Sequence, residues 1–324
     1  MSLEYRRNSV RPSTVYTPEW GSKTIAYLRT PTLYEYFRTY TPHGLVSQGI
    51  WVVANVMDAT GQKYNLFRQY KSMETAMTVS SLEVKGLDAT SKALFKPGEM
   101  YLGRCWHEID EERGLIEVKP YLANPNAFSV TIRPQHVDWK DANGRVDLAF
   151  DALGPALEYY VPGLIEDGMY RSEPMRARGA IDGTPVSGYG VIDAAWGAPG
   201  CDWVQSKIFA LLEKYWIVWL NVYDDDSTDT GIYCCGTDEF EAAYYCRNGE
   251  AMIGRHNHLD VRHAADGFIQ SATLQMDDQH FEFTPDARVM QVASMVSWAS
   301  GKVLNTADKR TPVQSFCWFE YMPK

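Results

Sequence analysis

The sequence predicts an all-β fold, an antiparallel sandwich or barrel. Short runs of β-branched and aromatic residues recur along the chain and are separated by turn residues. The sequence contains neither a long amphipathic helix nor an alternation of strands with helices. The chain also holds 10 Trp and 20 Tyr residues. Such side chains pack the pleated faces of sheets, and a surplus of them can also line a large apolar pocket.

The first half of the chain starts with a polar, Pro-containing segment, residues 1–24, which we expect to be an arm on the surface. The aromatic-rich segment 31–40 fits either a short helix or a strand. Residues 50–57 and 63–70 flank a Gly-containing turn and predict a hairpin. Further strands are predicted at 99–107, 115–121, 127–133 and 145–150.

The second half starts from a Pro- and Gly-rich stretch, residues 155–178, which we interpret as a crossing between domains. The 324 residues suffice for two domains of ordinary size, and we place them at 25–170 and 171–324. Strands of the second domain are predicted at 206–212, 215–223, 231–236, 241–246, 268–274, 280–284 and 316–321.

The composition excludes several classes of partner and cofactor. The formal net charge is −10, which argues against binding to nucleic acid or to an anionic membrane surface. We expect no membrane span, because no segment approaches about 18 uninterrupted apolar residues. The six cysteines lack CxxC spacing, and with no secretory signal they suggest reduced thiols in the cytoplasm. Dinucleotide, P-loop and HExxH motifs are absent, so we expect no cofactor.

The most informative stretch runs from Val186 to Gly197, Val-Ser-Gly-Tyr-Gly-Val-Ile-Asp-Ala-Ala-Trp-Gly. It reads as a strand that places one carboxylate, Asp193, among apolar neighbours. Burial in a low dielectric disfavours the charged form of a carboxyl group. Asp193 is therefore a candidate proton donor near neutral pH.

The pattern Gly-x-Gly-x-x-Asp-x-x-Trp-Gly in this stretch resembles the Asp-His-x-Trp-Gly signature of the carotenoid 1,2-hydratase (hydroxyneurosporene synthase) family. Kievitone hydratase and lipocalin-like pericyclases belong to the same superfamily. Residues 157–164 and 177–184 resemble the family's approach to the motif, and residues 318–322 resemble its closing strand. The resemblance implies two lipocalin-like antiparallel barrels or half-barrels, with a site at or near their junction. In this chain Ala194 stands where the family usually has His.

The resemblance implies a lyase without a cofactor, with Asp193 as the proton donor. In a hydratase such a group protonates an alkene carbon, and water traps the carbocation. We expect water or a small aldehyde to be added or removed at an apolar substrate, either aromatic and phenylpropanoid-like or isoprenoid. Aromatic side chains could stabilise positive charge, although core packing explains each of them equally well. The candidates are Tyr159, Tyr160, Tyr189, Trp196, Trp216, Trp219 and Tyr321.

A second group of polar residues spans Arg255 to His263. On a strand, His256, His258 and Asp260 would share one face, as in a metal site. We expect instead that His256 or His258 acts as a base in place of the residue missing at position 194, and that no metal is bound. Glu320 is either a solvated strand residue or, by its match to the family's closing Glu, a second acid inside the barrel.

Two other functions fit the same residues. A carrier of a hydrophobic ligand would use the fold without chemistry, and an isomerase or pericyclase would rearrange its substrate without changing its mass. The sequence does not fix the oligomeric state, and a homodimer remains one option.

Overall fold

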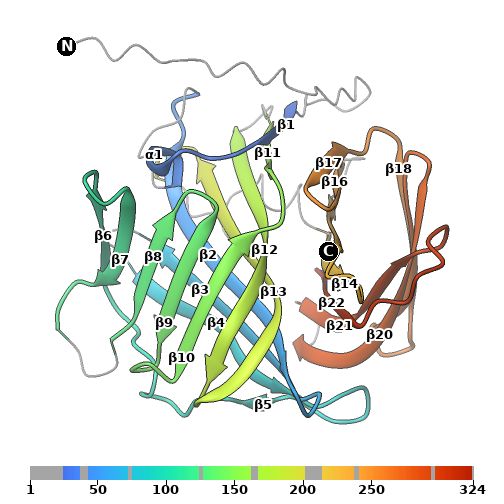
Figure 1. Cartoon of the computed structure of the whole chain (residues 1–324), viewed down its shortest axis with the longest axis horizontal. Helices are drawn as coiled ribbons and strands as arrows, with labels where there is room; N and C mark the ends of the chain where they lie inside the picture. The colour runs from blue at the N-terminus through green and yellow to red at the C-terminus, as the bar shows by residue number, and fades with distance from the viewer. Residues whose placement is uncertain are drawn as a thin grey trace.

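The computed structural model describes residues 25–36, 43–71, 75–123, 127–161, 167–200, 214–236, 241–292 and 296–322. It consists of two strongly curled antiparallel sheets that lie side by side (Figure 1). The predicted all-β class, with two antiparallel lipocalin-like half-barrels, is thus confirmed. The predicted arm 1–24 and the predicted strand 206–212 lie outside the described residues.

The first sheet has 13 strands, with the main order β5-β4-β3-β2-β13-β12-β10-β9-β8-β7-β6, and β11 pairs with both β1 and β12. The strands are β1 (Ile25–Arg29), β2 (Val46–Asp58), β3 (Lys63–Lys71), β4 (Thr75–Val84), β5 (Lys92–Ala93), β6 (Cys105–Asp110), β7 (Leu115–Pro120), β8 (Ser129–Arg133), β9 (His136–Asp141), β10 (Val146–Ala152), β11 (Ala156–Val161), β12 (Gly168–Ile181) and β13 (Thr184–Gly197).

The second sheet has nine strands in the order β17-β16-β15-β14-β22-β21-β20-β19-β18. They are β14 (Tyr215–Val222), β15 (Thr228–Cys235), β16 (Glu241–Arg247), β17 (Glu250–Ile253), β18 (Asn257–His263), β19 (Ile269–Met276), β20 (Gln279–Val292), β21 (Val296–Asn305) and β22 (Gln314–Tyr321). Almost every neighbouring pair is also sequential, because short turns join the strands.

The chain passes from one sheet to the other between Gly197 and Tyr215. The domain boundary that the sequence suggested, at residues 170/171, falls inside β12 of the first sheet. Residues 155–178, which we interpreted as a crossing between domains, instead contain β11 and much of β12, both strands of the first sheet. The N-terminal part of β12 pairs with β11, and its C-terminal part pairs with β10. The Asp193 strand β13 therefore belongs to the first sheet.

Other elements differ in detail from the prediction. The ambiguous segment 31–40 contains a short helix, α1 (Leu33–Tyr36), and its residues 37–40 are outside the described part. Strands β1, β4, β9, β17 and β21 were not predicted; in β4, β9 and β21 apolar residues are mixed with Ser, Thr or charged residues. The strand predicted at 99–107 begins only at Cys105, as β6. In the described residues, no helix is long and apolar enough to cross a membrane.

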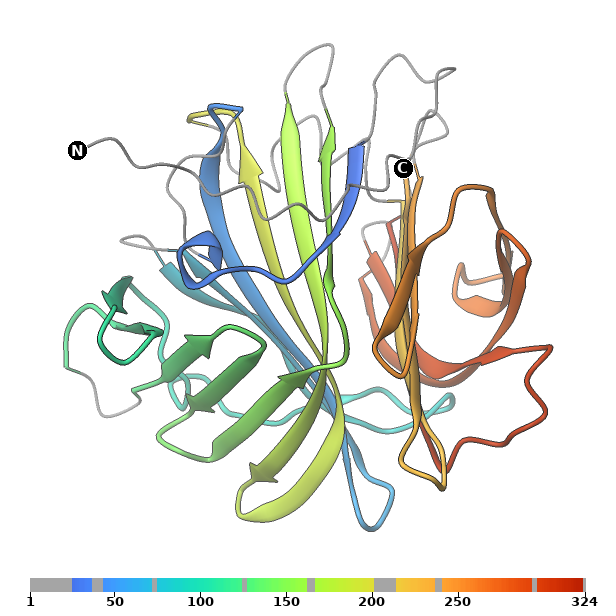
Figure 2. The ribbon, with the colours of Figure 1, turned by 45° about the horizontal axis from the view of Figure 1, so that its top comes forward.

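Side chains alternate between the two faces of a strand, so each sheet has an inner and an outer face. The inner faces enclose one apolar core in each half-barrel. A third apolar cluster lies between the sheets, and we name it the seam. It is formed mainly by β2, β11 and β13 of the first sheet and by β14, β15, β16, β21 and β22 of the second. Figure 2 shows the two sheets facing each other at this contact.

Candidate functional site

Asp193 lies on the face of β13 that is turned toward the seam. Its neighbours along that face, Val191 and Ala195, belong to the seam cluster, whereas Ile192 and Ala194 point into the first half-barrel. Across the sheet, Asp193 is paired with Ser172 of β12 on one side and Trp51 of β2 on the other. The carboxyl group is therefore held in the middle of the first sheet, where its residue is 1% exposed.

The glycines that precede Asp193 allow this close packing. A Cβ on Gly188 would come within 2.2 Å of the Asn55 carbonyl oxygen, and a Cβ on Gly190 would come within 2.2 Å of the Phe150 ring. Such distances leave no room for a side chain, so Gly188 and Gly190 let β13 approach its neighbours. The glycines of the motif thus have a packing role in positioning the Asp193 strand.

Burial raises the pKa of Asp193 to about 7. The side chains of Ser172 and Tyr170 and the charge of Arg171 act in the opposite direction. The carboxylate oxygen Oδ1 is buried and has no hydrogen-bond partner. Asp193 can therefore carry a proton at neutral pH and has one oxygen atom free to interact with a ligand.

Glu320 occupies the corresponding place in the second sheet. It lies on the seam face of β22 and is paired with Trp216 of β14 and Trp298 of β21. Trp318, two residues earlier, is on the same face. The Glu320 residue is 4% exposed, so its carboxyl group is buried beside tryptophan residues of three strands.

Burial also raises the pKa of Glu320 to about 7, and the indole groups of Trp298 and Trp318 oppose the rise. The negative charge of Asp193 raises it further. The two acids therefore interact across the seam, because a carboxylate on one sheet disfavours ionisation of the carboxyl on the other. Near neutral pH this arrangement favours a pair with one neutral acid and one carboxylate, which is what proton donation and acceptance require.

Several buried polar atoms in the seam have no hydrogen-bond partner. Besides Asp193 Oδ1, these atoms are Tyr189 Oη, Asn55 Nδ2 and the indole Nε1 of Trp298 and Trp318. The two indoles influence the pKa of Glu320, yet neither meets hydrogen-bond geometry. Burial and the charge of Asp193 raise the pKa of Tyr189, so its phenol stays a donor. An unpaired buried donor costs about 1–3 kcal/mol, so these groups favour a ligand that pairs with them.

The structure brings five of the predicted site residues to the seam: Asp193, Glu320, Tyr159, Tyr189 and Trp216. Tyr159 stacks on Tyr170 with ring centroids 5.6 Å apart, and its hydroxyl accepts a hydrogen bond from Cys234 Sγ at 3.7 Å. The five residues come from β11, β13, β14 and β22, so both sheets contribute to the site.

Four predicted aromatic residues lie elsewhere. Trp196 and Tyr160 pack against the core of the first half-barrel, where the Tyr160 ring stacks on His43 at 3.6 Å. Trp219 and Tyr321 pack in the second half-barrel. The reason is the alternation of side chains along a strand. Each of the four residues is adjacent in sequence to a seam residue, so its side chain points to the opposite face of the sheet.

His256 and His258 are exposed; His256 lies between β17 and β18 in the chain, and His258 lies on the edge strand β18 of the second sheet. The backbone N–H of His256 donates a hydrogen bond to Asp277, in the turn between β19 and β20. The structure therefore does not bring the imidazoles to the buried pair of acids. The described residues contain no group of three or more His, Cys, Asp or Glu side chains that could hold a metal ion.

Sequence reasoning did not name Trp51, Tyr170, Ser172, Trp298 or Trp318 as site residues. Trp318 could have been found, because it lies two positions before Glu320 on the same strand face. The other four reach the site through strand pairing and sheet packing, which no local pattern encodes.

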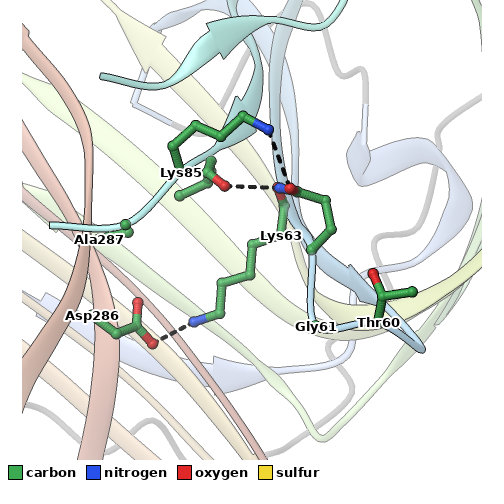
Figure 3. A pocket seen from close by; sticks show the side chains of 9 residues that line it. Thr60, Gly61, Lys63, Lys85, Asp286 and Ala287 are labelled. Atoms are coloured by element: carbon green, nitrogen blue, oxygen red, sulfur yellow. Dashed lines mark hydrogen bonds and ion pairs between the residues drawn. The ribbon is translucent and has the colours of Figure 1, made fainter. Parts of the chain in front are cut away.

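A surface pocket of about 410 Å³ adjoins the seam between the β2–β3 turn, the end of β4 and β20 (Figure 3). Lys63 of the first sheet and Asp286 of the second form an ion pair of 2.5 Å across it. Lys85 donates a hydrogen bond to Gln62 at 3.4 Å and is also paired with Glu83. Two of its lining residues, Val84 and Ala287, belong to the seam cluster. Its cations are thus already paired, which makes the acid pair the stronger candidate site.

Comparison with known proteins found no matching family model and no matching curated protein. Solved structures that resemble this chain include kievitone hydratase from Nectria haematococca, with 10% identity, a TM-score of 0.40, and coverage of 96% of this chain and 98% of that chain. CghA in complex with Sch210972 has 9% identity, a TM-score of 0.45, and coverage of 86% and 89%. The likeness is one of fold.

Proposed function

We propose that the seam is the active site of a lyase that works without a cofactor, with Asp193 and Glu320 as its acid–base pair. The observation that carries this proposal is the placement of two buried carboxyl groups on facing sheets, each with a pKa near 7 and each flanked by aromatic rings. A general acid or base is most effective when its pKa lies near the working pH.

Removal of water would proceed as follows. Neutral Glu320 gives its proton to the leaving hydroxyl group, and the C–O bond breaks with its electron pair, so that water departs. The carboxylate of Asp193 takes a proton from the neighbouring carbon, and the electrons of that C–H bond form the new C=C bond. Transfer of the proton from Asp193 back to Glu320 restores the starting state.

Addition of water runs in the opposite sense. Asp193 protonates an alkene carbon, a water molecule attacks the resulting cation, and Glu320 accepts the proton that the water loses. The cation lies between Trp51 on the first sheet and Trp216 and Trp298 on the second. The faces of indole rings attract a cation, by up to about 2 kcal/mol where water is excluded.

The polar atoms of the seam favour an oxygen-bearing aromatic substrate over a hydrocarbon polyene. The unpaired donors of Tyr189 and Asn55 need acceptors, which hydroxyl, ether or carbonyl oxygens supply and a hydrocarbon does not. The aromatic rings on both sheets would stack on a planar ring system. Removal of a small aldehyde from such a compound would use the same acid and base.

The first experiment is a thermal-shift and tryptophan-quenching screen of the purified protein against oxygenated aromatic dimers, polyenes, sterols and fatty acids. Each mixture is then analysed by mass spectrometry. A bound compound whose mass changes by water or formaldehyde supports a lyase, and loss of the change in Asp193→Asn with binding kept identifies the acid.

Two other functions would give different results in the same screen. A carrier would return the bound compound unchanged, and Asp193→Asn would leave its affinity intact. An isomerase or pericyclase would return a product of the same mass that separates by chromatography. Either result would contradict the lyase proposal.

A further inference from the structure

Arg171 lies on the face of β12 opposite to the seam, inside the first half-barrel. Its neighbour across the sheet is Ala194, which belongs to the core of that half-barrel. The Arg171 residue is 0% exposed. Its Nη1 donates a hydrogen bond of 2.8 Å to the carbonyl oxygen of Glu35 in α1, whereas Nε and Nη2 have no partner.

The charge of this guanidinium is not balanced by a direct ion pair within the described residues. Glu173, two residues along on the same face, accepts a hydrogen bond of 2.7 Å from the Tyr36 hydroxyl through Oε2. Its other oxygen, Oε1, is buried without a partner. Burial raises the pKa of Glu173, and the Tyr36 hydrogen bond and the charge of Arg171 oppose the rise. The cluster thus contains unused donors and an unused acceptor.

Arg68 in the same half-barrel shows how the chain satisfies a buried guanidinium elsewhere. Arg68 is also 0% exposed, but its Nε is 2.7 Å from Asp141 Oδ2 and its Nη2 donates to the carbonyl oxygen of Tyr101 at 2.9 Å. An isolated buried charge is costly unless it is paired. The charge of Arg171 acts on the carboxyl groups of Glu173 and Asp193, but its Nε–Nη2 edge has no hydrogen-bond partner, and a counter-ion can bind there.

The geometry of Arg171 defines the counter-ion. The rings of Tyr36 and Trp196 lie 4.7 and 5.4 Å from its Cζ atom, which leaves the Nε–Nη2 edge as the unused part of the group. That edge presents two parallel N–H donors, the arrangement that binds the two oxygens of a carboxylate. Since one guanidinium lies beside one glutamic acid, the site favours a ligand with a single negative charge over a phosphate dianion.

We propose that the Nε–Nη2 edge of Arg171 binds the carboxylate of a small organic acid inside the first half-barrel, with Glu173 Oε1 accepting a hydrogen bond from a hydroxyl of that ligand. This site is separate from the seam and does not depend on the lyase proposal. Because the cluster is fully buried, the covering residues must move for the ligand to enter. Binding is therefore slow.

The test is thermal unfolding of the full chain after long incubation with acetate, lactate, benzoate or phosphate at constant ionic strength. The melting temperature is expected to rise with the logarithm of carboxylate concentration, most strongly for lactate, and less for phosphate. Arg171→Met should lose the rise. Arg171→Lys keeps the charge but lacks the two parallel donors, so this variant should lose most of the rise in melting temperature.

Arg68→Met is the matched control, because it removes a buried guanidinium that is already paired. It should lower the melting temperature but keep the rise with lactate. Without ligand, Arg171→Met should melt at or above the temperature of the unchanged protein, since it removes an unpaired charge. The proposal is overturned if no carboxylate raises the melting temperature more than sodium chloride does, or if Arg171→Met and Arg171→Lys keep the full rise.

Discussion

Asp193 of β13 and Glu320 of β22 belong to different sheets, yet the negative charge of Asp193 raises the pKa of Glu320. The seam holds the two carboxyl groups among tryptophan and tyrosine rings and away from water. The fold thus brings two buried carboxyl groups from distant parts of the chain to one contact, where we propose that they act as an acid–base pair.

Asp193→Asn should lower kcat by about 10²–10⁴-fold, because an amide cannot donate a carboxylic proton. Glu320→Gln should cause a loss of similar size. If the two acids act as a pair, the double variant should be little worse than either single variant. Steady-state kinetics on a substrate from the screen measures these effects. Two losses that multiply would show that the acids act independently.

The raised pKa values give the stability of the protein a defined pH dependence. The carboxyl groups have ordinary values of 3.8 and 4.5 and folded values near 7, so the folded state binds more protons than the unfolded state between these limits. The stability that the two groups contribute is fully present below pH 4 and is lost as the pH rises through 7. Urea unfolding from pH 4 to 8 measures it.

The control for this pH dependence is Asp193→Asn, which lacks one of the two titrating groups. Its stability should fall less steeply between pH 4 and 7 than that of the unchanged protein. Equal slopes in the two proteins would contradict a raised pKa at Asp193.

Trp298 and Trp219 form a matched pair for locating the substrate. Trp298 is on the seam beside Glu320, whereas Trp219 points into the second half-barrel. Trp298→Phe should weaken binding of an oxygenated aromatic ligand about tenfold, because it loses an indole donor and part of the ring face. Trp219→Phe should leave the affinity unchanged. Calorimetry measures both, and equal effects would argue against binding in the seam.

The glycines of the Asp193 motif should differ in their tolerance of a methyl group. Gly190→Ala should lower the free energy of unfolding by about 1–3 kcal/mol, because the new Cβ would overlap the Phe150 ring at 2.2 Å. Gly197→Ala should change it by less than about 0.5 kcal/mol, since the nearest atom, in Gln48, is 3.5 Å away. Urea midpoints measure both effects, and equal destabilisation would show that the packing explanation is wrong.

The sequence by itself determined the fold class and singled out Asp193 and Glu320 as candidate acids. Alternating apolar residues and turn signals are local, so they predict strands such as β2, β3 and β14 without knowledge of their partners. Asp193 stood out because it is a lone carboxylate in an apolar strand. Glu320 was named only through its match to a family motif.

Tertiary structure decided which predicted side chains share a site. A strand has two faces, and only sheet packing determines which of them meets the other sheet. For that reason Trp216 lies beside Glu320, while Trp219, three residues later, is buried in a different core. The pairing of Trp51 with Asp193 and of Trp298 with Glu320 depends on strand register between distant segments, and so does the place where the chain changes sheets. Local patterns carry no information on these long-range contacts, because their energies arise only when the whole fold has formed.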